Sequence, residues 1–416
     1  MTESEFVYPR YGERSLAEVV PTIFSVLGVP DERNTLPESL WKREAQDCDK
    51  VVLFFIDGLG YDQVVKYRYF PFFNILTNMG NLNPITTVFP STTAAAVTTM
   101  HTGLTPQEHG LPEWNVYFEE IDMVIETMPF KQARSKKSDE LLEMGIDPEI
   151  LYSGPTVYEK LKLCGIKSFV LTHKDIAHSA YSSITQRGSE VVPYSRGSDM
   201  MIKLIKLLRE TRGPAYFYVY WSQVDASGHE FGPHSSEHKS ELSMLSHLAS
   251  SEFLEKLDKK SAENILFLLT ADHGQIGVKP GRIICLEDLF NLEEFLKRNS
   301  AGNTILPTGC PRDVFLFVRE EKLGATLDML KKRLAGYADV IHTSTAIFKG
   351  LFGINKPSEK FLKRIGNILI LPYTDYNIWN NGFSKKPSEF RGIHGGLSKR
   401  EMTIPFVSAK LSQLIK

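Results

Sequence analysis

Cysteine is scarce in this 416-residue sequence, and no two cysteines stand in a CxxC spacing. The four cysteines are dispersed, at Cys48, Cys164, Cys285 and Cys310. In a chain of this length, such a distribution indicates reduced thiols in a cytosolic protein rather than a disulfide framework. A single disulfide stays open as the alternative.

An excess of charge of one sign is also missing, because 48 lysines and arginines nearly balance 50 aspartates and glutamates. The formal net charge is −2. A protein that binds a nucleic-acid polymer usually carries a concentrated basic stripe, and an anionic membrane attracts the same kind of patch. We find no such stripe and therefore expect neither partner.

Long apolar runs are absent as well. No stretch approaches the ~20 apolar residues that a membrane-spanning helix needs. The first ten residues, MTESEFVYPR, lack the basic, then apolar, then small-residue pattern of a signal peptide. We therefore expect a soluble protein located in the cytoplasm.

Short apolar runs, in contrast, are prominent. Three of them are continuous rather than alternating: Val51–Ile56, Ala215–Trp221 and Ile265–Thr270. This pattern is typical of strands that are buried on both faces, as in parallel sheets. Lys167–Thr172 is a fourth candidate strand. Helical spacing at Leu151–Leu163, Ser198–Arg209 and Ser240–Leu257 alternates with these runs, which predicts an α/β fold with a doubly wound, mostly parallel sheet.

The rest of the chain suggests additions to that sheet. Ser15–Leu27 has helical spacing, and the polar residues 31–49 resemble a linker, so we expect residues 1–49 to pack on a core formed by residues 50–416. Two stretches, about 116–150 and 280–390, resemble insertions. The second is expected to form a small α+β lobe, with strands at Val314–Val318 and Ile368–Pro372 and a helix at Lys322–Leu334.

The three strongest strands all lead into acidic residues or histidines. The first is followed by Asp57, the second by Asp225 and His229, and the third by Asp272 and His273. Ligands of an open parallel sheet bind beyond the carboxyl ends of its strands, so these side chains should meet at one edge. Clustered carboxylates repel one another unless cations neutralise them, and mixed Asp and His ligands favour Zn²⁺, with Mn²⁺ as an alternative.

Each of these motifs has a simpler interpretation. A single aspartate after a strand is usually a turn former or a helix N-cap, and a lone DxxxH or Asp-His-Gly arises by chance. For any one of them the structural interpretation would be preferred. The occurrence of all three at the ends of strands in one sheet favours the functional interpretation.

Hydroxyl side chains precede a further helical segment. Ser91, Thr92 and Thr93 lead directly into Ala94, Ala95 and Ala96. A helix N-terminus attracts anions, so a hydroxyl nucleophile there would face a bound phosphate. The alternative is simple N-capping by one of the hydroxyls. Late in the chain, His394 lies between glycines in the stretch 392–396 and is a candidate final metal ligand.

Five motifs together resemble a known family: FFIDG, FPSTTAAAVTTMHTGLTPQEHG, VDASGHEFGP, TADHG and GIHGG. In their order and spacing, from residue 54 to residue 396, they resemble the type I phosphodiesterase/nucleotide pyrophosphatase branch of the alkaline phosphatase superfamily. The resemblance implies an alkaline phosphatase-like catalytic domain and a small phosphodiester or nucleotide substrate.

The resemblance also implies the site residues. Asp225, His229 and His394 would hold one zinc ion. Asp57, Asp272 and His273 would hold the second, with Thr93 bridging from metal to phosphorus as the nucleophile that forms a phospho-threonine intermediate. A phosphomonoesterase or phosphonate hydrolase on the same core is the alternative, and a non-catalytic metal-binding protein is less favoured.

The predicted substrate contacts rest on weaker signals. The family places an asparagine shortly after its His-Gly as a donor to a phosphate oxygen, whereas Asn115 follows His109-Gly110 one residue later than that pattern. We keep Asn115 as a candidate catalytic residue. Trp114 and Tyr373 are candidate substrate-binding residues, although core packing is the commoner role of a tryptophan.

Overall fold

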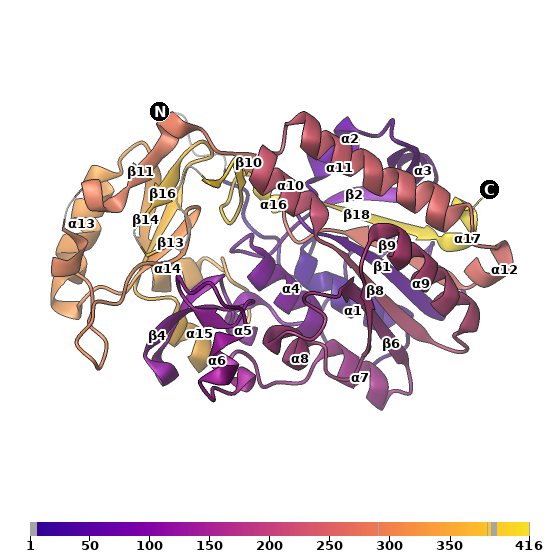
Figure 1. Ribbon diagram of the computed structural model, residues 1–416, viewed down its shortest axis with the longest axis horizontal. Helices are drawn as coiled ribbons and strands as arrows, with labels where there is room; N and C mark the ends of the chain where they lie inside the picture. The colour runs from indigo at the N-terminus through magenta and orange to yellow at the C-terminus, as the bar shows by residue number, and fades with distance from the viewer. Residues whose placement is uncertain (1–5, 290, 381, 384–388, 416) are drawn as a thin grey trace.

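The computed structural model describes residues 6–289, 291–380, 382–383 and 389–415. Within them, two seven-stranded sheets occupy opposite halves of the long axis (Figure 1). The first has the strand order β2-β18-β9-β1-β8-β6-β7, and the second has the order β14-β15-β13-β12-β3-β4-β5. We call the first the core sheet and the second the lobe sheet.

The core sheet is mostly parallel. Parallel pairs join β9 to β1, β1 to β8, β8 to β6 and β6 to β7, whereas β18 is antiparallel to both of its neighbours. The fold class predicted from the sequence is therefore confirmed. The strand bounds are β1 (Lys50–Ile56), β2 (Asn81–Thr86), β6 (Lys167–His173), β7 (Glu190–Tyr194), β8 (Ala215–Trp221), β9 (Ile265–Thr270) and β18 (Thr403–Lys410).

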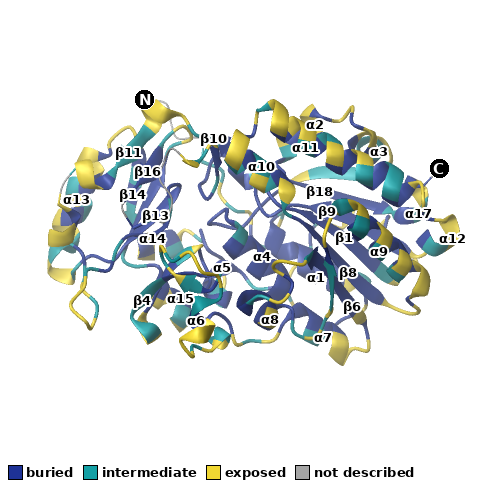
Figure 2. Ribbon diagram, viewed as in Figure 1, coloured by how far each residue is buried: buried dark blue, intermediate teal, exposed yellow. Residues whose placement is uncertain are grey.

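Continuous apolar sequence in the central strands matches continuous burial. Every residue of β8 and β9 is buried, and so is every residue of β1 after Lys50. Both faces are covered by helices whose outer sides alone are exposed (Figure 2). The α-helices of the described residues, in the core and the lobe together, are α1 (Val19–Val26), α2 (Tyr61–Lys66), α3 (Pro71–Met79), α4 (Thr93–Thr102), α5 (Pro106–His109), α6 (Glu140–Glu143), α7 (Val157–Leu163), α8 (Ala180–Thr185), α9 (Gly197–Glu210), α10 (Gln223–Phe231), α11 (Ser236–His247), α12 (Lys259–Ala262), α13 (Leu323–Arg333), α14 (Thr343–Phe348), α15 (Glu359–Arg364), α16 (Lys399–Met402) and α17 (Leu411–Leu414).

One helix begins later than its apolar spacing predicts. The spacing predicts a helix over Leu151–Leu163, but α7 begins at Val157. Thr156 caps it, accepting a hydrogen bond from the Glu159 N–H, while the Glu159 side chain accepts from the Thr156 N–H. This capping box fixes the helix start after Gly154-Pro155.

The N-terminal segment packs on the core sheet. A short 3₁₀ turn, Leu16–Glu18, precedes α1, and Leu16, Ile23 and Phe24 belong to the same apolar cluster as the central strands. Trp41, from the stretch expected to be a linker, is buried in that cluster as well. No helix in the described part of the chain is long and apolar enough to cross a membrane.

The two stretches that resemble insertions form one antiparallel sheet. The first supplies β3 (Asn115–Phe118), β4 (Met123–Glu126) and β5 (Lys131–Gln132). The second supplies β12 (Thr308–Cys310), β13 (Asp313–Leu316), β14 (Ala338–His342) and β15 (Ile368–Pro372). The two stretches join where Asn115 of β3 pairs with Gly309 of β12. At Gly309 φ is +86°, and a Cβ there would lie 2.0 Å from the Asp313 carbonyl oxygen. Only glycine fits that contact.

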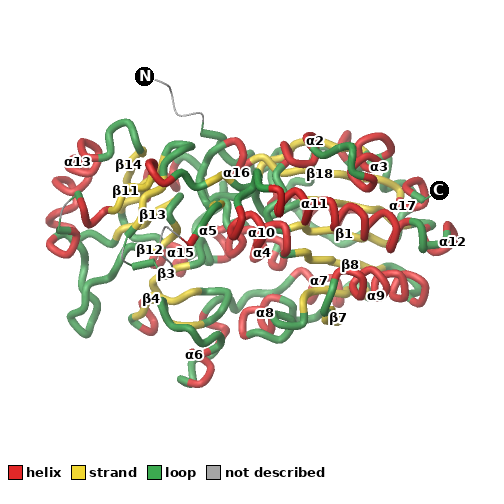
Figure 3. Tube along the Cα trace, turned by 45° about the horizontal axis from the view of Figure 1, so that its top comes forward, coloured by secondary structure: helices red, strands yellow, loops and turns green. Residues whose placement is uncertain are grey.

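Two small pairs of strands connect the halves: β10 (Ile276–Gly277) with β17 (Gly392–Ile393), and β11 (Ile283–Cys285) with β16 (Asn377–Trp379). In both ribbon and tube views, α4 and α10 lie near the middle of the long axis, where the core faces the lobe (Figures 1 and 3). The carboxyl ends of β1, β8 and β9 are directed to this boundary.

Candidate functional site

The acidic residues and histidines predicted at the strand ends do meet at this boundary. Asp57 follows β1, and Asp272 and His273 follow β9. Asp225 and His229 lie four residues apart on α10, which begins just after β8. His394 follows β17, which is held against β10 beyond the end of β9.

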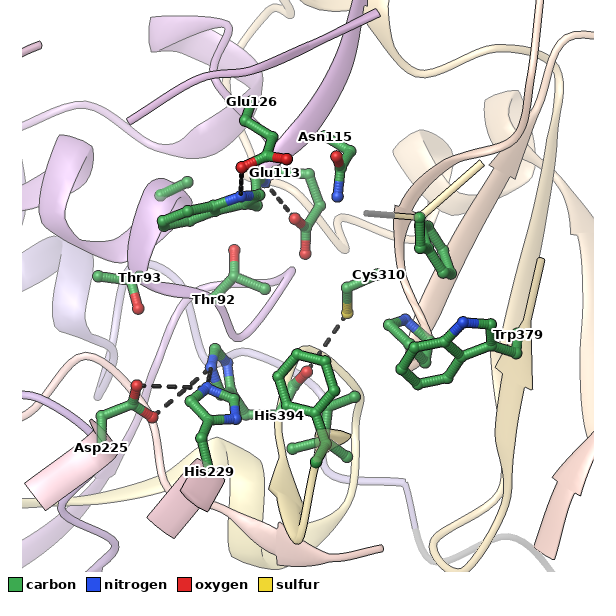
Figure 4. A pocket seen from close by; sticks show the side chains of 16 residues that line it. Thr92, Thr93, Glu113, Asn115, Glu126, Asp225, His229, Cys310, Trp379 and His394 are labelled. Atoms are coloured by element: carbon green, nitrogen blue, oxygen red, sulfur yellow. Dashed lines mark hydrogen bonds and ion pairs between the residues drawn. The ribbon is translucent and has the colours of Figure 1, made fainter. Parts of the chain in front are cut away.

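Asp225, His229 and His394 form a first group of candidate metal ligands. His229 Nε2 lies 3.3 Å from Asp225 Oδ2, and His394 Nε2 lies 3.7 Å from Asp225 Oδ1. The two Nε2 atoms are 3.2 Å apart. All three side chains therefore point at one volume (Figure 4).

A second group surrounds His273. Its Nε2 lies 3.2 Å from Asp272 Oδ2 and 3.6 Å from Asp57 Oδ1. Thr93 Oγ1 is 3.1 Å from the same nitrogen. The His273 and His394 rings are stacked with centroids 3.5 Å apart, so the two groups adjoin.

Backbone carbonyls orient the rings of the three histidines. Each Nδ1–H donates to a backbone carbonyl: His229 to Gly392 at 2.8 Å, His273 to Gly274 at 3.1 Å and His394 to Ser91 at 3.0 Å. A neutral imidazole that donates through Nδ1 presents a lone pair at Nε2. In that tautomer, His229 and His394 would both present Nε2 to the volume that they share with Asp225, as a common cation requires.

The buried carboxylates are also suited to binding metal ions. Asp57 Oδ1 and Asp272 Oδ2 are buried and have no hydrogen-bond partner among the described residues. Burial and the charges of Asp272 and Asp225 raise the pKa of Asp57 well above its usual range. Burial, together with the charge of Asp225, raises the pKa of Asp272 to about 6. Divalent cations would remove this repulsion, so the residues present fit two metal ions.

His273 and His394 are in the neutral form that binds metal. Burial lowers the pKa of His273 to about 4. Burial and the neighbouring His273 lower the pKa of His394 to about 3. Neutral imidazole is the form that binds metal, so neither histidine has to lose a proton near neutral pH.

Thr93 is the first residue of α4, and none of the nearby hydroxyls caps that helix. Thr92 occupies the N-cap position without a side-chain capping bond, and its Oγ1 has no hydrogen-bond partner among the described residues. Ser91 Oγ donates instead to the Gly396 carbonyl at 2.7 Å. The simpler interpretation of these hydroxyls as N-caps is therefore wrong, and the first N–H groups of α4 stay available for an anion.

Two side chains that the sequence analysis did not select hold the ligands in place. The Tyr220 hydroxyl donates to Asp57 Oδ2, and the Gln275 amide donates to Asp225 Oδ1. A Cβ at Gly228 would lie 1.7 Å from Gln275 Oε1, which shows how closely Gln275 packs on α10. Gln275 lies close to His273 in the sequence. Tyr220 lies inside a buried strand, where the sequence does not distinguish it from a tyrosine that only packs in the core.

A pocket of about 280 Å³ opens beside Thr93. The ligands Asp225, His229 and His394 line one side. The lobe and its connections line the other side with Glu113, Trp114, Asn115, Glu126, Cys310, Trp379, Phe383 and Phe390 (Figure 4). Among the described residues, no lysine or arginine lines this pocket.

The three predicted substrate-contacting residues lie in different environments. Trp114 lines the pocket, and its Nε1 donates to Glu126 at 3.1 Å. Asn115 also lines it, but its amide donates to the Gly309 carbonyl at 3.2 Å, within the lobe sheet. Tyr373 is not a lining residue: its position after β15 sets it beside β14, where its hydroxyl donates to Asp339 at 2.7 Å. The prediction that Tyr373 lines the pocket is therefore wrong.

The aromatic wall formed by Trp379, Phe383 and Phe390 was not selected from the sequence either. Trp379 is the last residue of β16, and the next strand, β17, leads into His394. Nothing local in the sequence indicates that this segment folds back over the site.

Comparison with known proteins agrees with this geometry. A sequence model of the family described as type I phosphodiesterase / nucleotide pyrophosphatase matches residues 51–397. The chain belongs to this family. The match includes all the predicted metal ligands and Thr93, and it confirms the resemblance drawn from the five motifs.

Individual relatives are distant. Ectonucleotide pyrophosphatase/phosphodiesterase family member 3 of Mus musculus is 24% identical over 281 residues, which cover 66% of this chain and 30% of the mouse protein. Venom phosphodiesterase of Naja atra is 22% identical over 291 residues, covering 67% of this chain and 32% of the cobra protein. The chain thus matches about a third of the length of these relatives.

Two solved structures share the fold. Murine ectonucleotide pyrophosphatase/phosphodiesterase 5, as an inactive variant in complex with AMP, has a TM-score of 0.62 at 20% identity, covering 87% of this chain and 88% of that one. Phosphonoacetate hydrolase from Sinorhizobium meliloti 1021, in complex with phosphonoformate, has a TM-score of 0.60 at 17% identity, covering 87% of this chain and 93% of that one.

Proposed function

We propose that this chain is a two-metal phosphodiesterase or nucleotide pyrophosphatase that works through a phospho-threonine intermediate. The observation that carries the proposal is that His273 Nε2 lies beside Thr93 Oγ1 and also beside the carboxylate oxygens of Asp57 and Asp272, which have no hydrogen-bond partner among the described residues. Thr93 also lies at the uncapped N-terminus of α4. A hydroxyl, an anion-binding helix end and a cation site are thus brought together at one point.

Asp225, His229 and His394 would hold one ion, and Asp57, Asp272 and His273 would hold the other. Nitrogen and oxygen ligands of this mixture favour Zn²⁺, with Mn²⁺ as the alternative. When bound, such ions supply charge neutralisation at phosphorus and lower the pKa of a hydroxyl that they contact. The Asp225 carboxylate lies close to Asp57 and His273 as well as to the first group, so it adjoins both sets of ligands.

The chain's own residues account for orientation and attack. The free N–H groups at the start of α4 hold phosphoryl oxygens, so phosphorus is presented to Thr93 Oγ1. Thr93 Oγ1 forms a bond to phosphorus, the hydroxyl proton is released, and the bond from phosphorus to the leaving oxygen breaks. Water then attacks the phospho-threonine, so that Thr93 is regenerated and the phosphate product departs.

The pocket supports a small phosphodiester or nucleotide as substrate. Trp114, Trp379 and Phe390 offer flat apolar surfaces to a base or an aryl group. A phosphomonoester carries more negative charge, and superfamily members that accept it are expected to add basic groups or a third metal ion. The described lining residues include no lysine or arginine, which favours a singly charged diester.

A phosphomonoesterase or phosphonate hydrolase is the second candidate. The similarity of fold to a phosphonoacetate hydrolase over 87% of the chain keeps it open. A metal-binding protein without activity is a third and weaker candidate, because it gives no reason for Thr93 to lie beside His273.

A paired assay tests the proposal. Zinc-loaded and manganese-loaded protein would be compared on bis-p-nitrophenyl phosphate and p-nitrophenyl phosphate, with Thr93→Ala as the blank. We expect preference for the diester and a loss of turnover by at least about 10³-fold in Thr93→Ala, since the nucleophile is removed. Preference for the monoester would move the protein to the second candidate, and full activity in Thr93→Ala would exclude Thr93 as nucleophile.

The cytoplasmic location belongs to this proposal as well. Cys48, Cys164, Cys285 and Cys310 are all free thiols, which supports a reducing compartment. Fractionation of the source cells with an antibody would test it.

A further inference from the structure

A second cluster of ligand-type side chains lies beside the site already described. Glu113 precedes β3, Cys310 ends β12 and Asp313 begins β13. One ligand atom from each lies within 4.8 Å of the others. Cys310 and Asp313 are paired across the β12–β13 turn, so the two are brought together by the lobe sheet itself.

Both carboxylates are fully buried, and each has one oxygen without a partner. Glu113 and Asp313 are 0% exposed. Glu113 Oε2 accepts the Trp114 N–H, and Asp313 Oδ1 accepts the Cys310 N–H at 3.2 Å. Glu113 Oε1 and Asp313 Oδ2 have no hydrogen-bond partner among the described residues. The Cys310 thiol also donates to Asp313 Oδ1, at 2.7 Å. One oxygen of each carboxylate is therefore hydrogen-bonded, and the other is left to the cluster.

No described cation neutralises these groups. Arg312 lies next to Asp313 in sequence, but its guanidinium is directed away and forms two 2.9 Å hydrogen bonds with Glu401. A buried carboxylate pair without a counter-charge is unfavourable and requires either bound protons or a bound cation. The thiol adds a ligand that selects for a thiophilic cation.

The cluster is adjacent to the first metal group but distinct from it. Cys310 Sγ lies 3.3 Å from the His394 carbonyl oxygen (Figure 4). A Cβ at Gly395, where φ is +125°, would lie 2.3 Å from that sulfur and 3.2 Å from Asp313 Oδ1. Glycine at this position therefore lets the cluster approach the loop of His394. Glu113 and Cys310 also line the pocket, so an ion held here would face a bound substrate.

We propose that Glu113, Cys310 and Asp313 form a third metal site, which takes a thiophilic divalent ion such as Zn²⁺. Binding forms a sulfur–metal bond at Cys310 and releases the thiol proton to solvent. Carboxylate oxygens from Glu113 and Asp313 complete the protein's part of the coordination shell. When occupied, the site would add positive charge to the lobe side of the pocket, where Glu113 and Glu126 lie. A third ion there would favour the phosphomonoester candidate over the diester.

Cobalt substitution separates this site from the other two. The ligands proposed for the two-metal centre are oxygen and nitrogen atoms only, so a thiolate-to-Co²⁺ charge-transfer band in the near ultraviolet reports cysteine ligation alone. We expect the apoprotein to bind three equivalents of Co²⁺ and to show that band. Cys310→Ser should lose the band and one equivalent, and Glu113→Gln should weaken the third equivalent by at least tenfold.

Matched controls keep the test decisive. Cys285→Ser, at a free cysteine in β11, should keep three equivalents and the full band. The titration needs no turnover, so its outcome does not depend on whether the chain is an esterase. If Cys310→Ser does not fold, the wild-type titration and the Cys285→Ser control still decide. Two equivalents without a thiolate band in the wild type, or a band that persists in folded Cys310→Ser, would overturn the proposal.

Discussion

Two tyrosines on β8 have different environments although they lie two residues apart on the same face. The Tyr220 hydroxyl donates to Asp57 Oδ2, whereas the Tyr218 hydroxyl is buried without a hydrogen-bond partner among the described residues. Their rings are stacked with centroids 6.5 Å apart. The pair therefore offers a test of how a metal ligand is positioned.

Tyr220→Phe is expected to weaken zinc binding by about 10- to 100-fold, because a hydrogen bond that orients a ligating carboxylate is lost. Competition with a chromogenic chelator measures this affinity. Tyr218→Phe removes an equivalent hydroxyl from the same strand and should leave the affinity unchanged. Equal effects of the two substitutions would show that Asp57 is not held by Tyr220.

At the residue scale, the sequence identified candidate metal ligands but not the side chains that orient them. Asp57 and Asp272 could be selected because each follows a continuous apolar run, which places it at a known edge of a parallel sheet. Tyr220 lies inside such a run, where its hydroxyl is indistinguishable from that of Tyr218. Tyr373 was placed wrongly because proximity to His394 in sequence does not determine the strand that it packs against.

At the scale of elements, a buried ion pair joins the lobe to the loop of His394. Arg312 lies between β12 and β13, Glu401 lies on α16, and both side chains are 0% exposed. Glu401 Oε1 also accepts the Gly396 N–H at 2.9 Å, which fixes the glycines after His394. The two halves of the molecule are thus connected through one bidentate contact.

Arg312→Gln should lower the free energy of unfolding by about 3–5 kcal/mol, because it leaves a buried carboxylate unpaired. Denaturant titration measures the loss. Arg319→Gln removes a half-buried arginine, 39% exposed at its side chain and 3.7 Å from Glu321, and should cost less than about 1 kcal/mol. If both variants lose the same small amount, Arg312 does not compensate the charge of Glu401.

The same pair predicts a pH dependence. Burial raises the pKa of Glu401, but Arg312 and its hydrogen bonds lower it overall, below the usual value of 4.5. A carboxyl whose pKa is depressed on folding contributes stability above its unfolded pKa and loses it as the pH falls through the folded value. The penalty of Arg312→Gln should therefore shrink as the pH falls below about 4.5.

Glu18, at the start of α1, should behave in the opposite way. Burial raises its pKa from 4.5 to about 7, although the N–H groups of Gly12 and Ser15 both donate to it. The folded state then holds the proton more tightly than the unfolded state, so stability is full below pH 4.5 and falls as the pH rises towards 7. The loss is on the order of 3 kcal/mol.

Glu18→Gln should remove this slope. The difference in unfolding free energy between wild type and variant, measured from pH 5 to pH 8 with chelator present, should change in favour of the variant as the pH rises. Glu13→Gln, at an exposed carboxylate paired with Arg10, serves as the control and should show no such trend. A constant difference across the range would contradict a raised pKa at Glu18.

Elements of the core sheet were more predictable than those of the lobe. Continuous apolar runs with helical segments between them define parallel strands locally, and Ala215–Trp221 was recovered with its bounds. The lobe depends on pairing between Asn115 and Gly309, which are 194 residues apart. Short sequences such as Thr308–Cys310 carry no signal for such a partner, so two apparent insertions could not be recognised as one sheet.

At the scale of the whole molecule, the two halves supply different residues of the candidate site. The core supplies Thr93 and the candidate metal ligands other than His394, which follows β17, whereas the lobe and its connections supply Trp114, Glu113, Cys310 and the aromatic wall. Under the proposed function, chemistry and substrate selection would be carried largely by different sheets. A change of substrate preference would require changes in the lobe alone, without any change at the ends of β1, β8 and β9.

The proposed metal ions should also determine how stable the whole fold is. Their ligands come from the ends of β1, β8 and β9 and from the loop after β17, so the ions join segments that are distant in sequence. An ion that binds only the folded state stabilises it by about 2.7 kcal/mol at a free concentration of 100 times Kd. Chelation should therefore lower the melting temperature, and zinc should restore it.

This stabilisation should weaken in acid, because protons compete with metal for the same carboxylates. Asp272, with a pKa raised to about 6 by burial and by the charge of Asp225, has to lose its proton before it can bind an ion. The zinc-induced shift in melting temperature should thus be larger at pH 8 than at pH 5. Asp225→Asn should reduce the shift at both values, whereas Thr93→Ala should keep most of it. A shift that is absent in the wild type, or unaffected by Asp225→Asn, would mean that these carboxylates do not hold the ions that stabilise the fold.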